Sequence, residues 1–169
     1  PGSGSLISSV ILKHKDLAGI HFTGSNPTFN TLWKQVSENL SAYRSYPKIV
    51  GETGGKDFIF AHKSAEPLEL ASAIARGAFE YQGQKCSAAS RAYIPRSLWK
   101  GTKNHLMMML AETKTGSERD FENAVNAVID EASFDRIMSY IDIARSSTSA
   151  EIIAGGKGDK STGYFIEPT

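Results

Sequence analysis

The stretch LAGIHFTGSNPTFNTLWKQVSENL, residues 17–40, carries the alternation of strand and helix from which the fold class follows. Its first eight residues form a short apolar run closed by Gly24, which is typical of a buried parallel strand. Further on, apolar residues recur every three or four positions and predict a helix with one apolar stripe, formed by Phe29, Leu32, Trp33, Val36 and Leu40. Ser25 or Asn26 can cap this helix through a side-chain oxygen, and Pro27 suits its first turn.

The same alternation of strand and helix continues along the chain. Strands are expected on both sides of a glycine turn within residues 47–62, and at 91–95, 150–156 and 163–168. Helices are expected within residues 64–81, 97–114 and 134–146, the first of them with Ser64 as a possible cap. Strands that alternate with helices predict an α/β fold with a mostly parallel sheet and flanking helices.

Composition limits the classes of function. A chain of 169 residues with 40% hydrophobic and 22% charged residues is typical of a globular domain. A net charge of +1 argues against nucleic acid or a membrane surface as a partner, and no apolar run is long enough to span a bilayer. One cysteine forms no internal disulfide, which favours a reducing compartment. The four histidines lack metal-ligand spacing, so no metal site is expected.

Cys86 is the first candidate for chemistry. A free cysteine usually packs as a small hydrophobic residue, but the Gly83-Gln84-Lys85 segment before it is polar and flexible, which suits packing poorly. A neighbouring cation such as Lys85, or a helix N-terminus, stabilises the nucleophilic thiolate. Cys86 is therefore either an inert thiol or a nucleophile.

Two further segments are candidates. Glu52 follows an apolar strand and precedes Thr53-Gly54-Gly55, so it is either a general base at the mouth of a site or a solvated turn carboxylate. The turn from Gly24 to Thr28 leads from a strand into a helix, an arrangement by which α/β proteins present backbone N–H groups to a phosphate or nucleotide. An ordinary strand-to-helix connection is the alternative for this turn.

Taken together and in this order, the three segments resemble the aldehyde dehydrogenase family. The family motifs correspond here to Phe22-Thr23-Gly24-Ser25, Glu52-Thr53-Gly54-Gly55-Lys56 and Gly83-Gln84-Lys85-Cys86. The longer stretches FTGSNPTF, GETGGKDF and FEYQGQKCSA resemble the branch of that family that oxidises glutamate semialdehyde. Thr53 departs from the pattern, because most members carry leucine there.

The resemblance implies a role for each candidate. Cys86 would be the nucleophile that forms a thiohemiacetal and then a thioester, and Glu52 would be the general base that activates water. The residues of the cofactor turn would contact NAD: Gly24, Ser25, Asn26, Pro27 and Thr28. Ser87 would hydrogen-bond the substrate's α-carboxylate, with a helix-capping serine as the alternative.

The resemblance also implies an organisation into two domains. Residues 1–53 would be the C-terminal part of the NAD-binding domain, and residues 54–169 the first part of the catalytic domain. The chain lacks an initiator methionine and ends within a strand-like pattern, so we expect a fragment that is inactive alone and a full protein that forms a homo-oligomer. The compartment would be the cytoplasm if the source is bacterial, or the mitochondrial matrix.

An aldehyde dehydrogenase with a different substrate stays open at this stage, and so do two other classes of function. A cysteine hydrolase or acyltransferase would pair Cys86 with one of the four histidines and need no NAD. A nucleotide-binding scaffold would leave the thiol inert. The partner of the dehydrogenase would be a small-molecule aldehyde, with NAD or NADP as oxidant.

Overall fold

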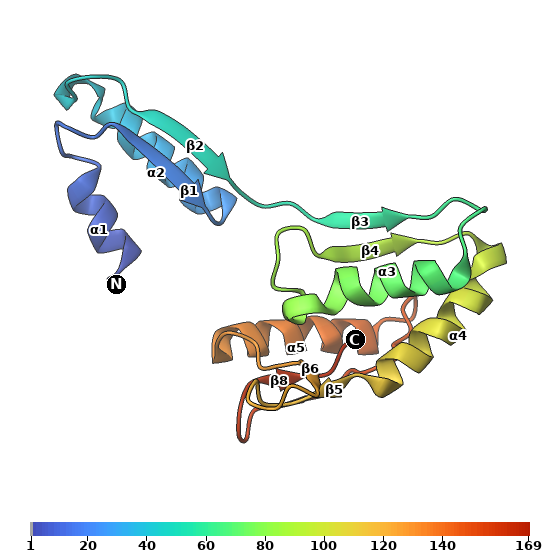
Figure 1. Ribbon diagram of the computed structural model, residues 1–169. Coiled ribbons are helices and arrows are strands. Elements are labelled where there is room, and N and C mark those ends of the chain that lie inside the picture. Colours follow the sequence, from blue (N-terminus) through green and yellow to red (C-terminus); the bar gives the residue numbers. More distant parts are fainter. Residues whose placement is uncertain (1) are drawn as a thin grey trace. The chain divides into compact units, whose positions relative to one another are not determined.

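The computed structural model describes residues 2–169, and the chain divides into two compact units, Pro1–Gly55 and Lys56–Thr169. Both units contain helices and strands, as Figure 1 shows, and within each unit these alternate as far as residue 112, after which strands follow in pairs before and after the helix of residues 131–146. Of the four strand pairs in the described residues, three are parallel. The prediction of an α/β fold with a mostly parallel sheet and flanking helices is therefore confirmed.

The first unit is built around one parallel strand pair. Its elements are α1 (Gly4–Ile11), β1 (Gly19–Thr23), α2 (Asn26–Glu38), the short 3-10 helix η1 (Leu40–Ala42) and β2 (Lys48–Glu52). Strand β1 pairs with β2 from Gly19 opposite Lys48 to Thr23 opposite Glu52. The core of the unit consists of Leu12, Leu17 and Val36, with Ile20, Leu32 and Ile49 packed against it. The apolar stripe expected on the helix thus supplies Leu32 and Val36, whereas Trp33 is exposed.

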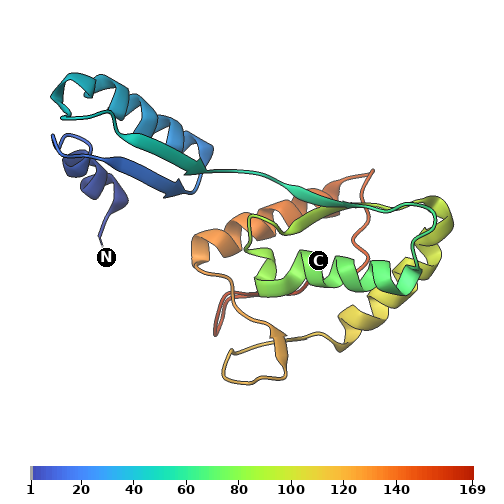
Figure 2. The ribbon, with the colours of Figure 1, turned by 45° about the horizontal axis from the view of Figure 1, so that its top comes forward.

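The second unit begins with a parallel strand pair and the helices beside it. Its first elements are β3 (Asp57–Phe60), α3 (Pro67–Phe79), the 3-10 segment η2 (Glu80–Gly83), β4 (Ala89–Tyr93) and α4 (Arg96–Glu112). Helix α3 runs beside the β3–β4 pair and packs against α4 (Figure 1 and Figure 2). The buried cluster between these elements contains Ala61, Leu70, Ala71, Ile74 and Leu106.

The second half of this unit packs around one helix. Its elements are β5 (Lys114–Thr115), β6 (Asn123–Val125), α5 (Glu131–Ser146), β7 (Gly158–Asp159) and β8 (Phe165–Ile166). Strands β5 and β6 are parallel, whereas β7 and β8 form the one antiparallel pair within residues 2–169. Val128, Phe134, Ile141 and Ile166 make the buried cluster here.

Two local predictions were wrong. Helix α3 begins at Pro67 after Glu66, and Ser64 does not cap it, because its hydroxyl shares a 2.9 Å hydrogen bond with Nδ1 of His62. Residues 150–156 do not form a strand. Gly155 and Gly156 have φ angles of +64° and +87°, so the chain bends there and the strand β7 starts only at Gly158.

Candidate active site

The cofactor turn and Glu52 lie at the same edge of the first unit. The parallel register places Thr23 directly opposite Glu52, so both strands end there. The backbone N–H of Gly24 donates to the carbonyl of Glu52 at 3.1 Å, which ties the first residue of the turn to the end of β2. The carboxyl ends of parallel strands, followed by a helix N-terminus, are where α/β folds place their ligands.

Of the two residues that the sequence offers as a cap for α2, Ser25 and Asn26, Ser25 is the one that caps it. Its hydroxyl accepts from the backbone N–H of Thr28 at 3.3 Å and lies 2.8 Å from the Thr28 hydroxyl. Pro27 occupies the first turn of the helix, where its missing N–H costs nothing. All five residues of the cofactor turn, from Gly24 to Thr28, are exposed.

Asn26 connects the cofactor turn to the segment that follows Glu52. Its side-chain oxygen accepts from the backbone N–H of Gly54 at 3.0 Å. Gly51 allows the helix to approach β2, because a Cβ at this position would lie 2.4 Å from the ring of Phe29. These contacts fix the end of β2, and the side chain of Glu52, the last residue of this strand, is exposed.

Cys86 belongs to the second unit and lies in an exposed tight turn. The backbone N–H of Ala88 donates to the carbonyl of Lys85 at 3.2 Å, so Cys86 and Ser87 are the two central residues of this turn. The thiol is free, and both Cys86 and Ser87 are exposed. The turn ends where β4 begins, at Ala89.

Lys85 forms an ion pair with Glu80. The ammonium lies 2.9 Å from a carboxylate oxygen of Glu80, and both side chains are about half exposed. A hydrogen bond from Lys85, reinforced by its charge and that of Arg76, holds the pKa of Glu80 below its usual value. The cation next to Cys86 in sequence is therefore engaged by a carboxylate of the preceding segment.

Sequence reasoning missed how the loop before Cys86 is fixed. Gln84 accepts a hydrogen bond from the backbone N–H of Ile129, 45 residues away, at 3.0 Å. Tyr81 and Gln82 adopt positive φ angles of 54° and 57°, followed by Gly83 at 65°. Gly83 was the one visible signal for this conformation, since tyrosine and glutamine rarely adopt it.

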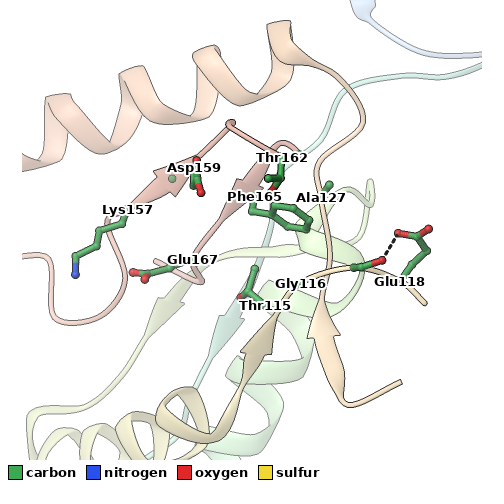
Figure 3. A pocket seen from close by; sticks show the side chains of 12 residues that line it. Thr115, Gly116, Glu118, Ala127, Lys157, Asp159, Thr162, Phe165 and Glu167 are labelled. Carbon is green, nitrogen blue, oxygen red and sulfur yellow. Dashed lines mark hydrogen bonds between the residues drawn. The ribbon is translucent and has the colours of Figure 1, made fainter. Parts of the chain in front are cut away.

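A broad cavity of about 860 Å³ opens elsewhere in the second unit, between the β5–β6 and β7–β8 segments. Figure 3 shows Thr115 and Glu118 on one side of it and Lys157, Asp159 and Glu167 on the other. Neither Cys86 nor Ser87 lines this cavity. This cavity is therefore not the site of thiol chemistry, although it is large.

In residues 2–169, no group of three or more His, Cys, Asp or Glu side chains is arranged to hold a metal ion. No helix within the same range has the length and apolar character needed to cross a membrane. Of the histidines, His62 contacts Ser64 and His14 contacts Asp16.

Comparison with known proteins identifies the family. The profile of the aldehyde dehydrogenase family matches residues 1–169, the whole of the chain. The chain belongs to the aldehyde dehydrogenase family.

Two aldehyde dehydrogenases that are similar to this chain share one name. The chain is 52% identical over 171 residues to the mitochondrial delta-1-pyrroline-5-carboxylate dehydrogenase of Dictyostelium discoideum, covering 100% of this chain and 31% of that protein. It is 48% identical over 169 residues to the human mitochondrial enzyme of the same name, covering 99% of this chain and 30% of that protein. The chain thus spans about a third of the length of these relatives.

A solved structure of the same name superposes closely. The delta-pyrroline-5-carboxylate dehydrogenase of Mycobacterium tuberculosis, in a crystal structure with NAD bound, matches with a TM-score of 0.94 at 47% identity. The match covers 99% of this chain and 31% of that one. The backbone described above is therefore a segment of an aldehyde dehydrogenase fold.

Proposed function

We propose that the protein acts in the NAD-dependent oxidation of L-glutamate γ-semialdehyde, the open form of 1-pyrroline-5-carboxylate, to glutamate, a step of proline catabolism. The observation that carries the proposal is the 47% identity and 0.94 TM-score to an NAD-bound enzyme of that name, over nearly the whole chain. The chain contributes two reactive side chains to this chemistry, Cys86 and Glu52.

The hydrogen-bond donors of the cofactor turn suit NAD. An exposed helix N-terminus with a hydroxyl at Ser25 offers the positive end of a 13-residue helix, which suits the diphosphate of a dinucleotide. Gly24 and Thr28 bound the turn, and Asn26 and Pro27 begin the helix. When bound, NAD supplies a hydride acceptor, which allows a thiohemiacetal to become a thioester.

Cys86 supplies the nucleophile. Its thiolate sulfur attacks the aldehyde carbon, a C–S bond forms, and the carbonyl π electrons move to oxygen, which becomes an oxyanion. The exposed position of Cys86 in the Lys85–Ala88 turn gives an aldehyde access to the sulfur. The backbone N–H of Cys86 is a donor for the oxyanion, which preorganised N–H groups stabilise.

Glu52 acts in the second half of the reaction. Its carboxylate accepts a proton from water as the water oxygen attacks the thioester carbon, and the tetrahedral product collapses with release of the thiolate of Cys86 and the carboxylic acid. A base is required here because water is a weak nucleophile near neutral pH. An exposed carboxylate at the end of β2 suits this task.

Ser87 is proposed to select the substrate. As the exposed neighbour of Cys86 in the turn, its hydroxyl can donate to the α-carboxylate of an amino-acid aldehyde. A site with such a donor discriminates against plain alkyl aldehydes, which leave the donor unpaired. Loss of the hydroxyl should therefore raise KM for the amino-acid aldehyde more than for an alkyl one.

The proposal extends to the partners and the compartment of the protein. The substrate class is a small-molecule aldehyde, and we propose a homo-oligomer for the protein at its full natural length. Relatives from Dictyostelium discoideum and from human are named as mitochondrial proteins. We propose the cytoplasm as the compartment if the source is bacterial, and the mitochondrial matrix otherwise.

NADH formation from glutamate semialdehyde tests the function. In the protein at its full natural length, wild type should form NADH steadily, whereas Cys86→Ala should form none. Ser87→Ala should keep turnover of an alkyl aldehyde and lose affinity for glutamate semialdehyde. Steady NADH formation by Cys86→Ala would contradict the proposal, and so would thiol-dependent hydrolysis of an ester without any NADH from the aldehyde.

A further inference from the structure

The loop before Cys86 has an unfavourable backbone conformation. Tyr81, Gln82 and Gly83 follow one another in the left-handed region, with φ angles of 54°, 57° and 65°. Non-glycine residues persist in this region only when surrounding contacts hold them there. The loop that presents the thiol therefore needs an external support.

Gln84 supplies such a support through its side chain. Its carbonyl oxygen accepts from the backbone N–H of Ile129 at 3.0 Å, while its own backbone N–H donates to the carbonyl of Tyr81 at 3.0 Å. Ile129 is an exposed residue, with 81% of its surface accessible. The side chain of Gln84 is the partner that the structure gives this N–H.

Gln82 reaches the same segment. In the amide orientation that satisfies both of its polar atoms, its oxygen accepts from the backbone N–H of Asn126 at 2.5 Å, and its nitrogen donates to the carbonyl of Tyr81 at 3.1 Å. Two glutamines on alternate positions thus bind two backbone N–H groups of residues 126–129. A pair of such bonds fixes both the position and the direction of the loop.

The segment that receives these bonds is itself firmly held. Val128 is 5% exposed within the cluster around α5, and its N–H donates to the carbonyl of Tyr164 at 2.9 Å. The side-chain nitrogen of Asn126 donates to the carbonyl of Gly116 at 3.0 Å. The loop is therefore tied to a packed part of the second unit.

We propose that Gln84 is a positioning residue, which sets the place of the Cys86 turn by binding the Ile129 N–H. The inference rests on the proposed role of Cys86 as the nucleophile. Gln84 acts two residues before the sulfur, so release of its side chain lets the Lys85–Ala88 turn shift relative to the rest of the unit. A shift of about 1 Å at a reacting group can lower the rate by a factor on the order of a hundred.

The test combines amide exchange with kinetics in the protein at its full natural length. Gln84→Met keeps the length of the side chain and removes the acceptor, so the Ile129 amide should exchange with solvent roughly fivefold to tenfold faster. In the same variant kcat should fall about tenfold or more, with KM changed less than about twofold. Gln84→Glu keeps an acceptor and should retain the protection of Ile129.

Two controls separate positioning from general loss of structure. Gln35→Met makes the same change on α2, in the first unit, and should alter neither measurement. If Gln84→Met fails to fold, Gln84→Asn replaces it, because its shorter side chain withdraws the acceptor while remaining polar. Failure of both variants to fold would overturn the inference, since Gln84 would then be required for folding itself.

The remaining outcomes are also decisive. Unchanged Ile129 exchange in Gln84→Met would show that the bond does not form in solution and would overturn the inference. Faster exchange with unchanged kcat would make Gln84 structural only, with the proposed function intact. Absence of NADH formation in wild type would refute the proposed function, and the inference about catalysis would fall with it.

Discussion

Replacement of Gly51 by alanine should destabilise the first unit through one contact. A Cβ at residue 51 would lie 2.4 Å from the Cζ atom of Phe29 and 2.8 Å or less from the two neighbouring ring atoms. Carbon atoms in ordinary contact are about 3.5–4.0 Å apart, so the ring must move by roughly 1 Å or more. The ring of Phe29 stacks on that of Phe22, with 6.0 Å between the ring centroids, and meets the ring of Trp33 edge-on, with 5.6 Å between the centroids. Both arrangements would change.

The expected loss is about 1–3 kcal/mol of unfolding free energy, the usual cost of an extra carbon in a packed site. Gly55→Ala is the matched control, because a Cβ there meets nothing within 4 Å, and it should be neutral or slightly stabilising. Urea unfolding followed by Trp33 fluorescence, with Trp99 replaced by phenylalanine, measures both variants.

A double-mutant cycle isolates the contact between Gly51 and Phe29. In a Phe29→Ala background the obstacle is absent, so Gly51→Ala should cost almost nothing there. Equal stability of Gly51→Ala and Gly55→Ala would refute the reasoning. A full penalty that persists in the Phe29→Ala background would also refute it.

Three further predictions concern the second unit. Thr102 on α4 is fully buried and its hydroxyl lacks a hydrogen-bond partner, so Thr102→Val should raise the unfolding free energy by about 1 kcal/mol, and a lower Tm would contradict this. Asp130 caps α5 by accepting from the N–H of Ser133 at 2.7 Å, so Asp130→Ala should cost about 1 kcal/mol in urea unfolding, whereas Asp130→Asn should cost much less. Because Lys85 lowers the pKa of Glu80, their pairing stabilises the fold fully above the usual glutamate pKa of 4.5 and is lost as the pH falls through the lowered value. Titration of the Glu80 carboxyl by NMR should show its pKa rising in Lys85→Met, and an unchanged pKa would refute this assignment.

The strand and helix pattern was predictable where apolar periodicity is strong. Helix α2 begins one residue after Ser25, as the cap and the proline together predict. Ser64 is the opposite case: its hydroxyl suggests a cap, but Pro67 at the first helical position places the cap at Glu66. The position of the proline was the stronger signal.

Short strands near the end of the chain were harder to predict. Residues 150–156 are apolar enough for a strand, but Gly155 and Gly156 turn the chain before it pairs. The pairing occurs two residues further on, between Gly158 and Ile166. Apolar content alone cannot separate these outcomes, because a strand exists only where a partner accepts its hydrogen bonds.

The candidate site was only partly accessible to sequence reasoning. The motifs identified Cys86 and Glu52 as candidates because the residue type alone shows which side chains carry a thiol or a carboxylate. The bond between Gln84 and Ile129 joins residues 45 positions apart and leaves no periodic signal. The hydrogen bond from the backbone N–H of Gly54 to the side chain of Asn26, on the cofactor turn, also joins residues far apart in the sequence.

A single-turnover experiment with Glu52→Gln tests the central claim that Cys86 and Glu52 share one reaction. In the mechanism proposed for the protein at its full natural length, acylation needs only Cys86 and NAD, whereas release of the product needs the base. On mixing with glutamate semialdehyde, the variant should form one NADH per site and then stall, with the acyl group on Cys86 detectable by mass spectrometry. Steady turnover at the wild-type rate, or a stalled enzyme with neither NADH nor an acyl group, would contradict the account.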